Sequence, residues 1–388
     1  MRVITFSPYY PPHRGGLETH SDEFNKYLSE EGAEIIVFTP RLPVDALELE
    51  TMHHGVTIIR YPSVEIIHNY PIPRFWQKRF WTLWQELKRK NVDIVISRTR
   101  FFFPSLMAGY YAWRKNTPWV HIEHGSDFAQ FEKNWKSILG KLYDYTLGKL
   151  VLKSADTLIA NSQASTKFVE YLSGRRDCHT LYRGVEKELI LNTSPSTEWR
   201  AVYQNKTIVG YIGRLIEGKG VKDLIQAFSE IKRTDCLLVI IGDGPERSTL
   251  EEFVVKEKMS NQVLFLGALP LPIAMGYLKV WDIFVNPSYT EGIPTSVIEA
   301  ALLKKAIIAT NVGGTNEIIS GTDDGILIPP RDIQALVDAL SQLIENSELR
   351  KSYGEKAYTQ VLDTFLWEKA ITKYQTLFIE IIANKRLL

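Results

Sequence analysis

The amino-acid sequence predicts an α/β protein built from two Rossmann-like, doubly wound domains. Along the 388 residues, short apolar runs rich in β-branched residues alternate with helical patterns, and this alternation is typical of parallel βαβ units. The polar stretch 192–205 divides the alternation into two series. We therefore expect a first domain at residues 1–190 and a second at 191–364, followed by a helical segment at 365–388.

Each predicted domain contains six strands. Those of the first domain are Arg2–Ser7, Glu34–Thr39, Val56–Tyr61, Asp93–Arg98, Trp119–His124 and Asp156–Asn161. Those of the second are Thr207–Gly213, Cys236–Gly242, Gln262–Gly267, Trp281–Asn286, Ala306–Thr310 and Gly325–Ile328. Ligands of such sheets bind outside the carboxyl ends of the strands, and two facing sheets form a cleft. We therefore expect the functional site between the domains, in loops that follow strands.

The composition is that of a soluble globular protein that does not bind nucleic acid. Hydrophobic residues make up 45% and charged residues 23% of the chain, and the net charge is +1, far from the basic excess of a nucleic-acid binder. No apolar run approaches the roughly 20 residues that cross a bilayer, and no secretory signal is visible. Cys178 and Cys236 each begin an apolar run and are expected to be buried free thiols in a reducing cytoplasm.

Two glutamates flank one predicted helix start. Glu291 precedes the helix and Glu299 lies within it. Proline suits the first helical position, and hydroxyl side chains suit a first turn whose amides are unpaired. The residues between the glutamates fit this description: Gly292, Ile293, Pro294, Thr295 and Ser296. The stretch therefore predicts a site for a phosphate flanked by hydroxyl-rich groups.

The chemistry of this stretch favours a sugar nucleotide. A helix N-terminus carries about half a positive charge and outward-pointing N–H groups, which suits a diphosphate. Carboxylates beside a diphosphate repel it unless they point at neutral donors such as sugar hydroxyls. Glu299 then accepts from a ribose, and Glu291 from a second sugar beyond the phosphates. Taken singly, each glutamate would be interpreted as an ordinary solvated charge.

The frame Glu-Gly-Ile-Pro-Thr-Ser-Val-Ile-Glu-Ala, which begins at Glu291, resembles the signature of the retaining family 4 glycosyltransferases of GT-B fold, the glycosyl transferases group 1. The resemblance covers nearly the whole chain. It implies that Glu291 binds hydroxyls of the donor sugar, that the following loop amides hold the sugar and diphosphate, and that Glu299 binds the nucleotide ribose. It also implies that the helix at 365–388 packs back on the first domain.

The run Gly213-Arg-Leu-Ile-Glu-Gly-Lys-Gly220 lies between a predicted strand and a helix. It nearly spells a P-loop, but Gly220 stands where a P-loop needs the hydroxyl that holds magnesium. The resembled family carries Gly-Arg-Leu followed by Lys-Gly at this place. By that resemblance, Arg214 and Lys219 neutralise the departing diphosphate and stabilise the transition state. The chain has no Asp-x-Asp motif, so we expect transfer that needs neither a metal nor another cofactor.

A glycine pair follows the first predicted strand. Gly15 and Gly16 open a predicted helix, where paired glycines allow the backbone to approach a diphosphate closely, although such a pair can equally be a plain turn. The family has a Gly-Gly loop at this place, so both glycines are expected to bind the donor. His13 of the same loop is a candidate for the acceptor side.

His124 ends a predicted strand in His-Ile-Glu-His-Gly-Ser-Asp. A single histidine is usually structural, but the family places one here, close to the transferred sugar. His124 is therefore a candidate hydrogen-bond donor to the sugar or the reaction centre, and Asp127 is a candidate on the acceptor side. His121 and Glu123 alternate with His124 and are expected to point elsewhere, and two histidines three positions apart do not make a metal site.

Three further loops follow strands of the second domain. Asp243 ends a strand and precedes a helix, so we interpret it as structural. The run Gly267-Ala-Leu-Pro lies where the family's backbone pairs with the nucleobase, which makes Leu269 a candidate for donor binding. The stretch 311–315 is expected to shape the floor of the cleft.

The segment 74–90 is basic and amphipathic. Apolar side chains repeat along it at helical spacing: Trp76, Phe80, Leu83, Trp84 and Leu87. Two interpretations stay open. The segment is either an interfacial helix that lies on a membrane surface, with a lipid-linked acceptor, or a helix packed on its own sheet with its basic residues in water.

The resemblance implies a retaining enzyme. The cysteines indicate the cytoplasm, and the interfacial interpretation of 74–90 would put the enzyme on the inner face of the membrane. It would move a hexose-type sugar from a UDP- or GDP-sugar to a hydroxyl acceptor, a glycan or lipid-linked precursor of the cell envelope. Three other classes stay open: an epimerase of the same fold that acts on the sugar nucleotide, a magnesium-dependent P-loop NTPase, and a non-catalytic sugar-nucleotide binder.

Overall fold

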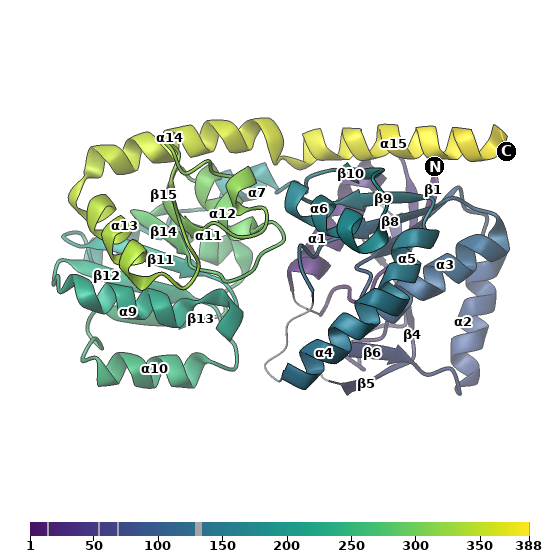
Figure 1. The fold of residues 1–388 in the computed structure, drawn as a ribbon, viewed down its shortest axis with the longest axis horizontal. Coiled ribbons are helices and arrows are strands. Elements are labelled where there is room, and N and C mark those ends of the chain that lie inside the picture. Colours follow the sequence, from purple (N-terminus) through teal and green to yellow (C-terminus); the bar gives the residue numbers. More distant parts are fainter. Residues whose placement is uncertain (14, 53–54, 68–69, 129–133, 388) are drawn as a thin grey trace. The chain divides into compact units, whose positions relative to one another are not determined.

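The computed structural model of the chain describes residues 1–13, 15–52, 55–67, 70–128 and 134–387. These residues form two compact units (Figure 1). Unit 1 comprises Met1–Gly184 and Trp367–Leu388, and unit 2 comprises Val185–Leu366. Each unit has its own largely parallel sheet and its own hydrophobic core.

The sheet of unit 1 has eight strands in the order β10-β9-β8-β7-β1-β2-β4-β3. In chain order they are β1 Arg2–Phe6, β2 Glu34–Pro40, β3 Leu49–Met52, β4 Val56–Tyr61, β7 Ile94–Arg98, β8 Trp119–Glu123, β9 Thr157–Ala160 and β10 Cys178–Thr180. All neighbours are parallel except β3, which pairs with β4 antiparallel. β1 lies between β2 and β7, so the strand order reverses at the carboxyl ends of β1 and β7, where doubly wound sheets bind ligands.

Helices cover both faces of this sheet. On one face, α1 (Gly16–Glu30) packs with the C-terminal helix α15 (Trp367–Leu387), and Tyr374 meets the ring of Phe24 at 5.0 Å between ring centroids. The helices on the opposite face are α2 Lys78–Arg89, α3 Phe103–Lys115, α5 Lys149–Ser154 and α6 Gln163–Ser173. α4 (Asn134–Tyr143) continues into α5 through a π-helical segment, Asp144–Gly148. A small antiparallel sheet is formed by β5 (Ser63–Ile67) and β6 (Tyr70–Pro73).

The sheet of unit 2 has six parallel strands in the order β13-β12-β11-β14-β15-β16. The strands are β11 Thr207–Ile212, β12 Cys236–Ile241, β13 Val263–Gly267, β14 Ile283–Asn286, β15 Ala306–Thr310 and β16 Ile326–Ile328. The helices are α7 Lys187–Leu191, α8 Thr197–Val202, α9 Val221–Ile231, α10 Arg247–Lys256, α11 Leu271–Lys279, α12 Thr295–Leu302, α13 Ile333–Glu345 and α14 Ser347–Thr364. Here the strand order reverses between β11 and β14.

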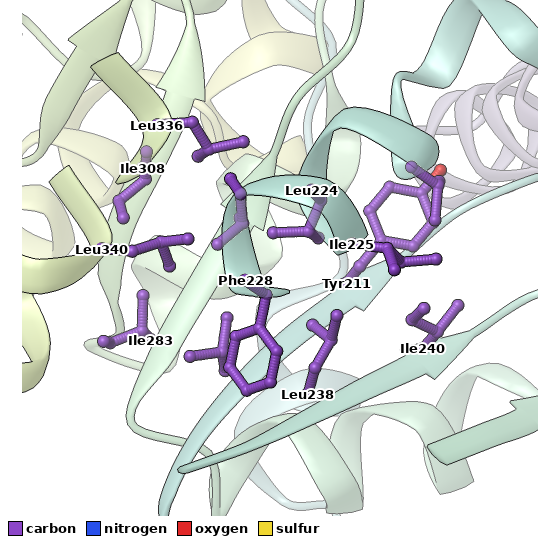
Figure 2. Close-up of a cluster of buried hydrophobic side chains, with 14 of the residues drawn as sticks. Tyr211, Leu224, Ile225, Phe228, Leu238, Ile240, Ile283, Ile308, Leu336 and Leu340 are labelled. Atoms are coloured by element: carbon purple, nitrogen blue, oxygen red, sulfur yellow. The ribbon is translucent and has the colours of Figure 1, made fainter. Parts of the chain in front are cut away.

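Apolar periodicity explains the core of unit 2 (Figure 2). On α9, Leu224 and Phe228 lie one turn apart and pack onto the sheet, where they meet Leu238 of β12. Leu336 and Leu340 of α13 lie one turn apart in the same core. Side chains four positions apart share one face of a helix, so each helix buries one stripe against the sheet.

All twelve predicted strands are present, with ends that differ by at most two residues. Four further strands were not predicted: β3, β5, β6 and β10. They are short, and Pro71 and Pro73 interrupt the pattern of β6, since proline is unusual inside a strand. The predicted helix at the C-terminus is present as α15, and it belongs to unit 1.

The segment 74–90 folds onto the core of unit 1. In α2, four apolar side chains are buried: Phe80, Leu83, Trp84 and Leu87. Trp76 and Trp81 are exposed. The stripe at helical spacing is therefore the inner face of a packed helix, and it cannot serve as a membrane-facing stripe. Among the described residues, no helix combines the length and apolar character that crossing a bilayer requires.

The two cysteines are free thiols, as predicted. Cys236 is buried, whereas Cys178 is only half-buried in the short strand β10. Burial raises the pKa of Cys178 to about 12 and that of Cys236 to about 11, so both remain protonated near neutral pH.

Candidate active site

In unit 2, two loops meet where the strand order reverses. The loop 213–220 follows β11 and the loop 287–294 follows β14, and these strands are neighbours in the sheet. Gly220 has a φ of +63°, and a Cβ there would lie 2.1 Å from the carbonyl oxygen of Pro287. Only glycine allows this conformation together with so close an approach. The second glycine of the Gly-Lys-Gly run therefore holds the two loops together.

An ion pair joins the same two loops. Lys219 Nζ lies 2.5 Å from Oε1 of Glu291, and the Ser288 hydroxyl donates to that oxygen at 2.7 Å. The side chain of Lys219 is 23% exposed and that of Glu291 is 11% exposed. The sequence placed these two residues in separate motifs, and the structure brings them into direct contact. A cation and a carboxylate oxygen thus lie side by side at the edge of the sheet.

The loop that carries Glu291 ends at the N-terminus of α12. Pro294 is the N-cap and the helix begins at Thr295, so the proline lies one position before the predicted one. Thr295 and Ser296 occupy the first turn and are half-buried. Glu299 is buried and lies four positions after Thr295, on the same face of the helix. Hydroxyls, helix N-terminus and the second glutamate are therefore gathered on one side of α12.

A second glycine contact supports this loop. Gly313 has a φ of +54°, and a Cβ there would lie 1.7 Å from the carbonyl oxygen of Glu291. The backbone amide of Gly314 donates to the carbonyl of Gly292 at 2.8 Å. Ile293 is buried behind the loop. The stretch 311–315 therefore fixes the backbone that leads into α12.

The other predicted residues of unit 2 lie on neighbouring loops. Gly213 packs against the ring of Tyr211, whose hydroxyl donates to the carbonyl of Arg214 at 3.0 Å. The side chain of Arg214 is exposed, and it does not take part in the contact between Lys219 and Glu291. Leu269 is half-buried in the loop between β13 and α11.

Asp243 has the structural role that was predicted for it. Its carboxylate accepts from the amide of Gly244 at 2.8 Å and pairs with Arg247 at the start of α10 at 3.3 Å. These contacts stabilise the turn between β12 and α10.

In unit 1, the glycine pair lies where α1 begins. Gly15 is the N-cap and Gly16 is the first helical residue. A Cβ on Gly15 would lie 2.5 Å from a carboxylate oxygen of Glu18, whereas a Cβ on Gly16 would meet nothing within 4 Å. Glu18 is buried and forms an ion pair with His13, whose ring stacks on Tyr9. His13 is thus tied to the start of α1, and the backbone at Gly16 borders open space.

A buried carboxylate shapes the loop after β8. Glu123 Oε1 accepts from the backbone amides of His124 and Gly125, both at 2.9 Å. Its other oxygen accepts from the amide of Arg100 at 3.0 Å and lies 3.3 Å from the guanidinium of that residue. Burial by itself raises the pKa of Glu123, but the Arg100 cation and the hydrogen bonds outweigh it and bring the pKa well below the usual range. Glu123 is therefore an ionised anchor that fixes the backbone of His124.

Arg100 connects this loop to the helical layer. Its guanidinium forms two hydrogen bonds of 2.9 Å with Asp144 in the π-helical segment. It also donates to the backbone carbonyl of Asp127 at 3.1 Å. The carboxylate of Asp127 accepts from the amide of Phe128 at 2.7 Å, and the residue is exposed. Asp127 thus lies at the surface, while its backbone belongs to the Arg100 network.

His124 lies against a cluster of buried side chains. Its ring meets that of His20 edge-on, at 4.5 Å between centroids, and Nδ1 of His20 lies 3.0 Å from a guanidinium nitrogen of Arg98. Because arginine only donates, Nδ1 of His20 accepts and the ring proton is on Nε2. Burial, followed by the charge of Arg98, lowers the pKa of His124 to about 3. Burial and the neighbouring His124 lower the pKa of His20 well below its ordinary value, so both rings are neutral near pH 7.

Several polar atoms of this cluster have no hydrogen-bond partner among the described residues. They are Nε2 of His20, Nε2 of His124, and Nε and Nη2 of Arg98. Arg98 is fully buried and its guanidinium lies 4.6 Å from the ring centroid of Phe24. A buried polar group without a partner destabilises a fold by about 1–3 kcal/mol. The cluster therefore keeps hydrogen-bonding capacity that the described residues do not use.

The sequence prediction did not single out Arg98, Arg100 or His20, and it expected Glu123 to point elsewhere. One signal was present in Ser-Arg-Thr-Arg, which puts two arginines at the carboxyl end of a central strand, where ligands of such sheets bind. For His20 the signal was its spacing of one helical turn from Gly16. The carboxylate anchor carried no signal, because its partners are mostly backbone amides.

Comparisons with known proteins connect this geometry to one family. Residues 14–189 match the family described as Glycosyltransferase Family 4, and residues 197–360 match the Glycosyl transferases group 1. An uncharacterized glycosyltransferase of Methanocaldococcus jannaschii is 34% identical over 390 residues, which cover 98% of this chain and 99% of that relative. The chain is a glycosyltransferase of this family.

Two further similarities add to this assignment. The N,N'-diacetylbacillosaminyl-diphospho-undecaprenol alpha-1,3-N-acetylgalactosaminyltransferase of Campylobacter jejuni is 25% identical to this glycosyltransferase, over 92% of the chain and 94% of that relative. The crystal structure of HepE from Anabaena in complex with UDP and glucose has a TM-score of 0.78 at 16% identity, over 98% of this chain and 100% of that chain. The α/β fold of GT-B type that the sequence predicted is thereby confirmed.

Proposed function

We propose that this glycosyltransferase moves a hexose-type sugar from a nucleoside diphosphate sugar to a hydroxyl acceptor, with retention of the anomeric configuration and without a metal ion. The observation that carries the proposal is the contact of Lys219 with Glu291 beside the N-terminus of α12. A sugar diphosphate presents hydroxyl donors next to phosphate anions. The contact offers the complementary pair, an acceptor oxygen next to a cation.

In this proposal unit 2 holds the donor. The N-terminus of α12 and the backbone of 292–296 bind the diphosphate. Glu299, on the same face of α12 as the first turn, accepts from the ribose, and Glu291 accepts from hydroxyls of the transferred sugar. The backbone at Leu269 pairs with the nucleobase, and Gly213 lets the diphosphate approach the end of β11.

Two cations supply the charge that a metal would otherwise supply. Negative charge grows on the diphosphate oxygens as the bond to the sugar breaks. Lys219 and Arg214 therefore stabilise the transition state more than the ground state. Because Lys219 and Glu291 contact each other at 2.5 Å, donor binding exchanges this contact for two others, the cation with phosphate and the carboxylate with sugar hydroxyls.

Unit 1 supplies the groups next to the acceptor. The open backbone at Gly16 suits a diphosphate oxygen, and neutral His124 donates to a hydroxyl of the transferred sugar. His13 and Asp127 are assigned to the acceptor side. No protein nucleophile is needed, because the leaving phosphate accepts the proton of the attacking hydroxyl.

The comparisons support particular substrates. The structural neighbour binds UDP and glucose, which favours a UDP-hexose, with a GDP-hexose as the second choice. The name of the Campylobacter relative contains a diphospho-undecaprenol, which favours a lipid-linked sugar, a precursor of an envelope glycan, as the acceptor.

The test is a transfer assay with UDP- and GDP-hexoses and a lipid diphosphate sugar as acceptor, in the presence of a chelator. We expect a product that keeps the anomeric configuration of the donor, seen by NMR, at a rate that the chelator does not change. An inverted product, or activity that requires a divalent cation, contradicts the proposal. Conversion of the donor in the absence of any acceptor would identify an epimerase instead.

A further inference from the structure

Unit 1 exposes a set of large apolar side chains on one helical layer. They come from α3 and from the continuous segment of α4, the π-helical turn and α5, and they are each 41–73% exposed: Tyr110, Trp113, Ile138, Leu139, Leu142, Tyr145, Leu147 and Leu150. We call this set the α3–α5 surface. Within the described part of unit 2, the exposed large apolar side chains are scattered over four helices: Leu189, Val202, Val255 and Ile273.

Helices α3 and α5 of the α3–α5 surface are neighbours (Figure 1). Their inner sides share one core, to which Tyr111 of α3 and Leu152 of α5 belong. Their outer sides border a cavity of about 440 Å³, which is lined by Tyr110, Trp113 and Leu150. The exposed rings of α3 therefore border a recess whose lining is mostly apolar, with Asp156 and Lys385 as its charged residues.

The α3–α5 surface is also strongly basic. The sequences of α3, α4 and α5 contain no acidic residue. The basic residues of these helices whose side chains the structure describes are Arg114, Lys115, Lys141, Lys149 and Lys153. The single acid of the connecting π-helical segment, Asp144, is fully buried and bound to Arg100. The cations of this surface are thus not balanced by acids on the same helices.

We propose that the α3–α5 surface binds an anionic lipid bilayer. Trp and Tyr side chains favour the boundary between headgroups and acyl chains, and Lys and Arg add attraction to anionic headgroups. The recess between α3 and α5 gives an apolar place for acyl carbons. A second copy of this face would bring the same cations against one another, so its charge fits a bilayer and opposes a symmetric dimer.

This surface differs from the stripe of the 74–90 segment. All residues of that stripe except Trp76 are buried. α2 borders α3 through Trp84, whose ring lies 6.2 Å from that of Tyr110. The inference deepens the proposed function and rests on it in one respect, because a lipid-linked acceptor gives a reason to hold the enzyme at a bilayer. The binding itself requires neither donor nor acceptor.

The test is co-sedimentation with vesicles of phosphatidylcholine, alone and with phosphatidylglycerol added. We expect the wild-type chain to bind the vesicles that contain phosphatidylglycerol, and high salt to weaken this binding. Each Lys→Glu change at Lys141 or Lys149 lowers the affinity by about fivefold or more, because a basic residue near an anionic surface contributes about that factor. The pair Trp113→Ser and Leu150→Ser lowers it by about tenfold.

Matched controls come from unit 2. Two double variants change exposed side chains of the same kinds: Val202→Ser with Val255→Ser, and Lys256→Glu with Lys258→Glu. Both should leave vesicle binding unchanged. Thermal unfolding checks that every variant is folded.

Three outcomes overturn the proposal: no binding by the wild-type chain, equal binding by the α3–α5 variants, or a dimer in light scattering that the Trp113→Ser and Leu150→Ser changes dissociate. Transfer to a water-soluble acceptor is measured in parallel and should be unchanged in these variants. Vesicle binding without any transfer by the wild-type chain would contradict the proposed function and leave the surface standing.

Discussion

The loops at the two reversal points of the sheets differ in their electrostatics. In unit 2, Lys219 and Glu291 form an ion pair in which both side chains are partly exposed. In unit 1, Arg98, His20 and His124 lie together, and no carboxylate of the described residues is hydrogen-bonded to their side chains. One region pairs its charges, whereas the other leaves buried donors unpaired and keeps its histidines neutral.

Because of this difference, we expect the two regions to have different roles in binding a ligand. A ligand that carries both anionic phosphates and hydroxyl donors can replace each partner of the ion pair in unit 2, so that neither charge is left unpaired. The two histidines of unit 1 stay neutral over a wide pH range and offer fixed hydrogen bonds. We infer that unit 2 responds to the charge of the donor, and unit 1 to the positions of its hydroxyl groups.

The largest expected effect is on the ion pair of unit 2. Lys219→Ala and Glu291→Ala should each lower kcat/KM by about 10³-fold, because each removes a group that acts on the departing diphosphate or the donor sugar. The free energy of unfolding should fall by about 1–3 kcal/mol, because either change leaves the partner charge largely buried and unpaired. Steady-state transfer rates and urea unfolding measure the two effects. Near wild-type turnover in either variant would refute the assigned role.

The next effect is on the carboxylate anchor of unit 1. Glu123→Gln should lower the free energy of unfolding by about 3 kcal/mol, because it takes a buried charge away from Arg100. Urea unfolding measures this change. Asp127→Asn, at an exposed carboxylate on the same loop, is the matched control and should shift the value by less than about 0.5 kcal/mol. If both variants unfold at the same urea concentration, Glu123 is not an anchor.

A smaller effect on turnover is expected at His124. His124→Ala should lower kcat/KM by about 10²-fold through loss of one oriented donor. Because burial lowers the pKa of His124 to about 3, its protonation should cause no loss of rate between about pH 5 and about pH 8. The measurement is the pH dependence of kcat/KM for both proteins. An acid limb in that range that disappears in His124→Ala would contradict the neutral state.

The smallest effect near pH 6 is a pH dependence of stability in unit 1, which grows as the pH falls further. The folded chain holds His20 and His124 with lowered pKa values, while the unfolded chain protonates them near pH 6.5. Stability is therefore fully present above about pH 6.5 and is lost as the pH falls below it, by about 1.4 kcal/mol per pH unit for each histidine. In urea unfolding at several pH values, His20→Gln should show a shallower dependence than the wild-type chain. Identical slopes would show that His20 is not held neutral.

Much of the fold could be predicted because the central strands are continuous apolar runs. β12, with the sequence Cys-Leu-Leu-Val-Ile-Ile, is buried at every position, and such a run has few other interpretations. The short edge strands lacked this signal. The stripe of α2 was ambiguous for another reason, since helical spacing alone is the same for a helix on its own sheet and a helix on a membrane.

The candidate site could be predicted where a residue acts through a local motif. Gly16, Lys219 and Glu291 stand in recognisable frames after strands. What the sequence could not give is the contact of Lys219 with Glu291, because it joins residues 72 positions apart. The lack of hydrogen-bond partners at Nε and Nη2 of Arg98 was equally hidden, since the burial of these atoms and the absence of an acceptor near them depend on the packing of several elements.

The C-terminal helix has a consequence for how the chain folds as it is made. α15 completes the core that contains Phe24, yet it follows the whole of unit 2 in the sequence. During synthesis, the whole of unit 2 leaves the ribosome before Trp367, Tyr374 and Phe378 can cover α1. Unit 2 is therefore able to fold first, while one apolar face of unit 1 stays uncovered until α15 has been synthesised.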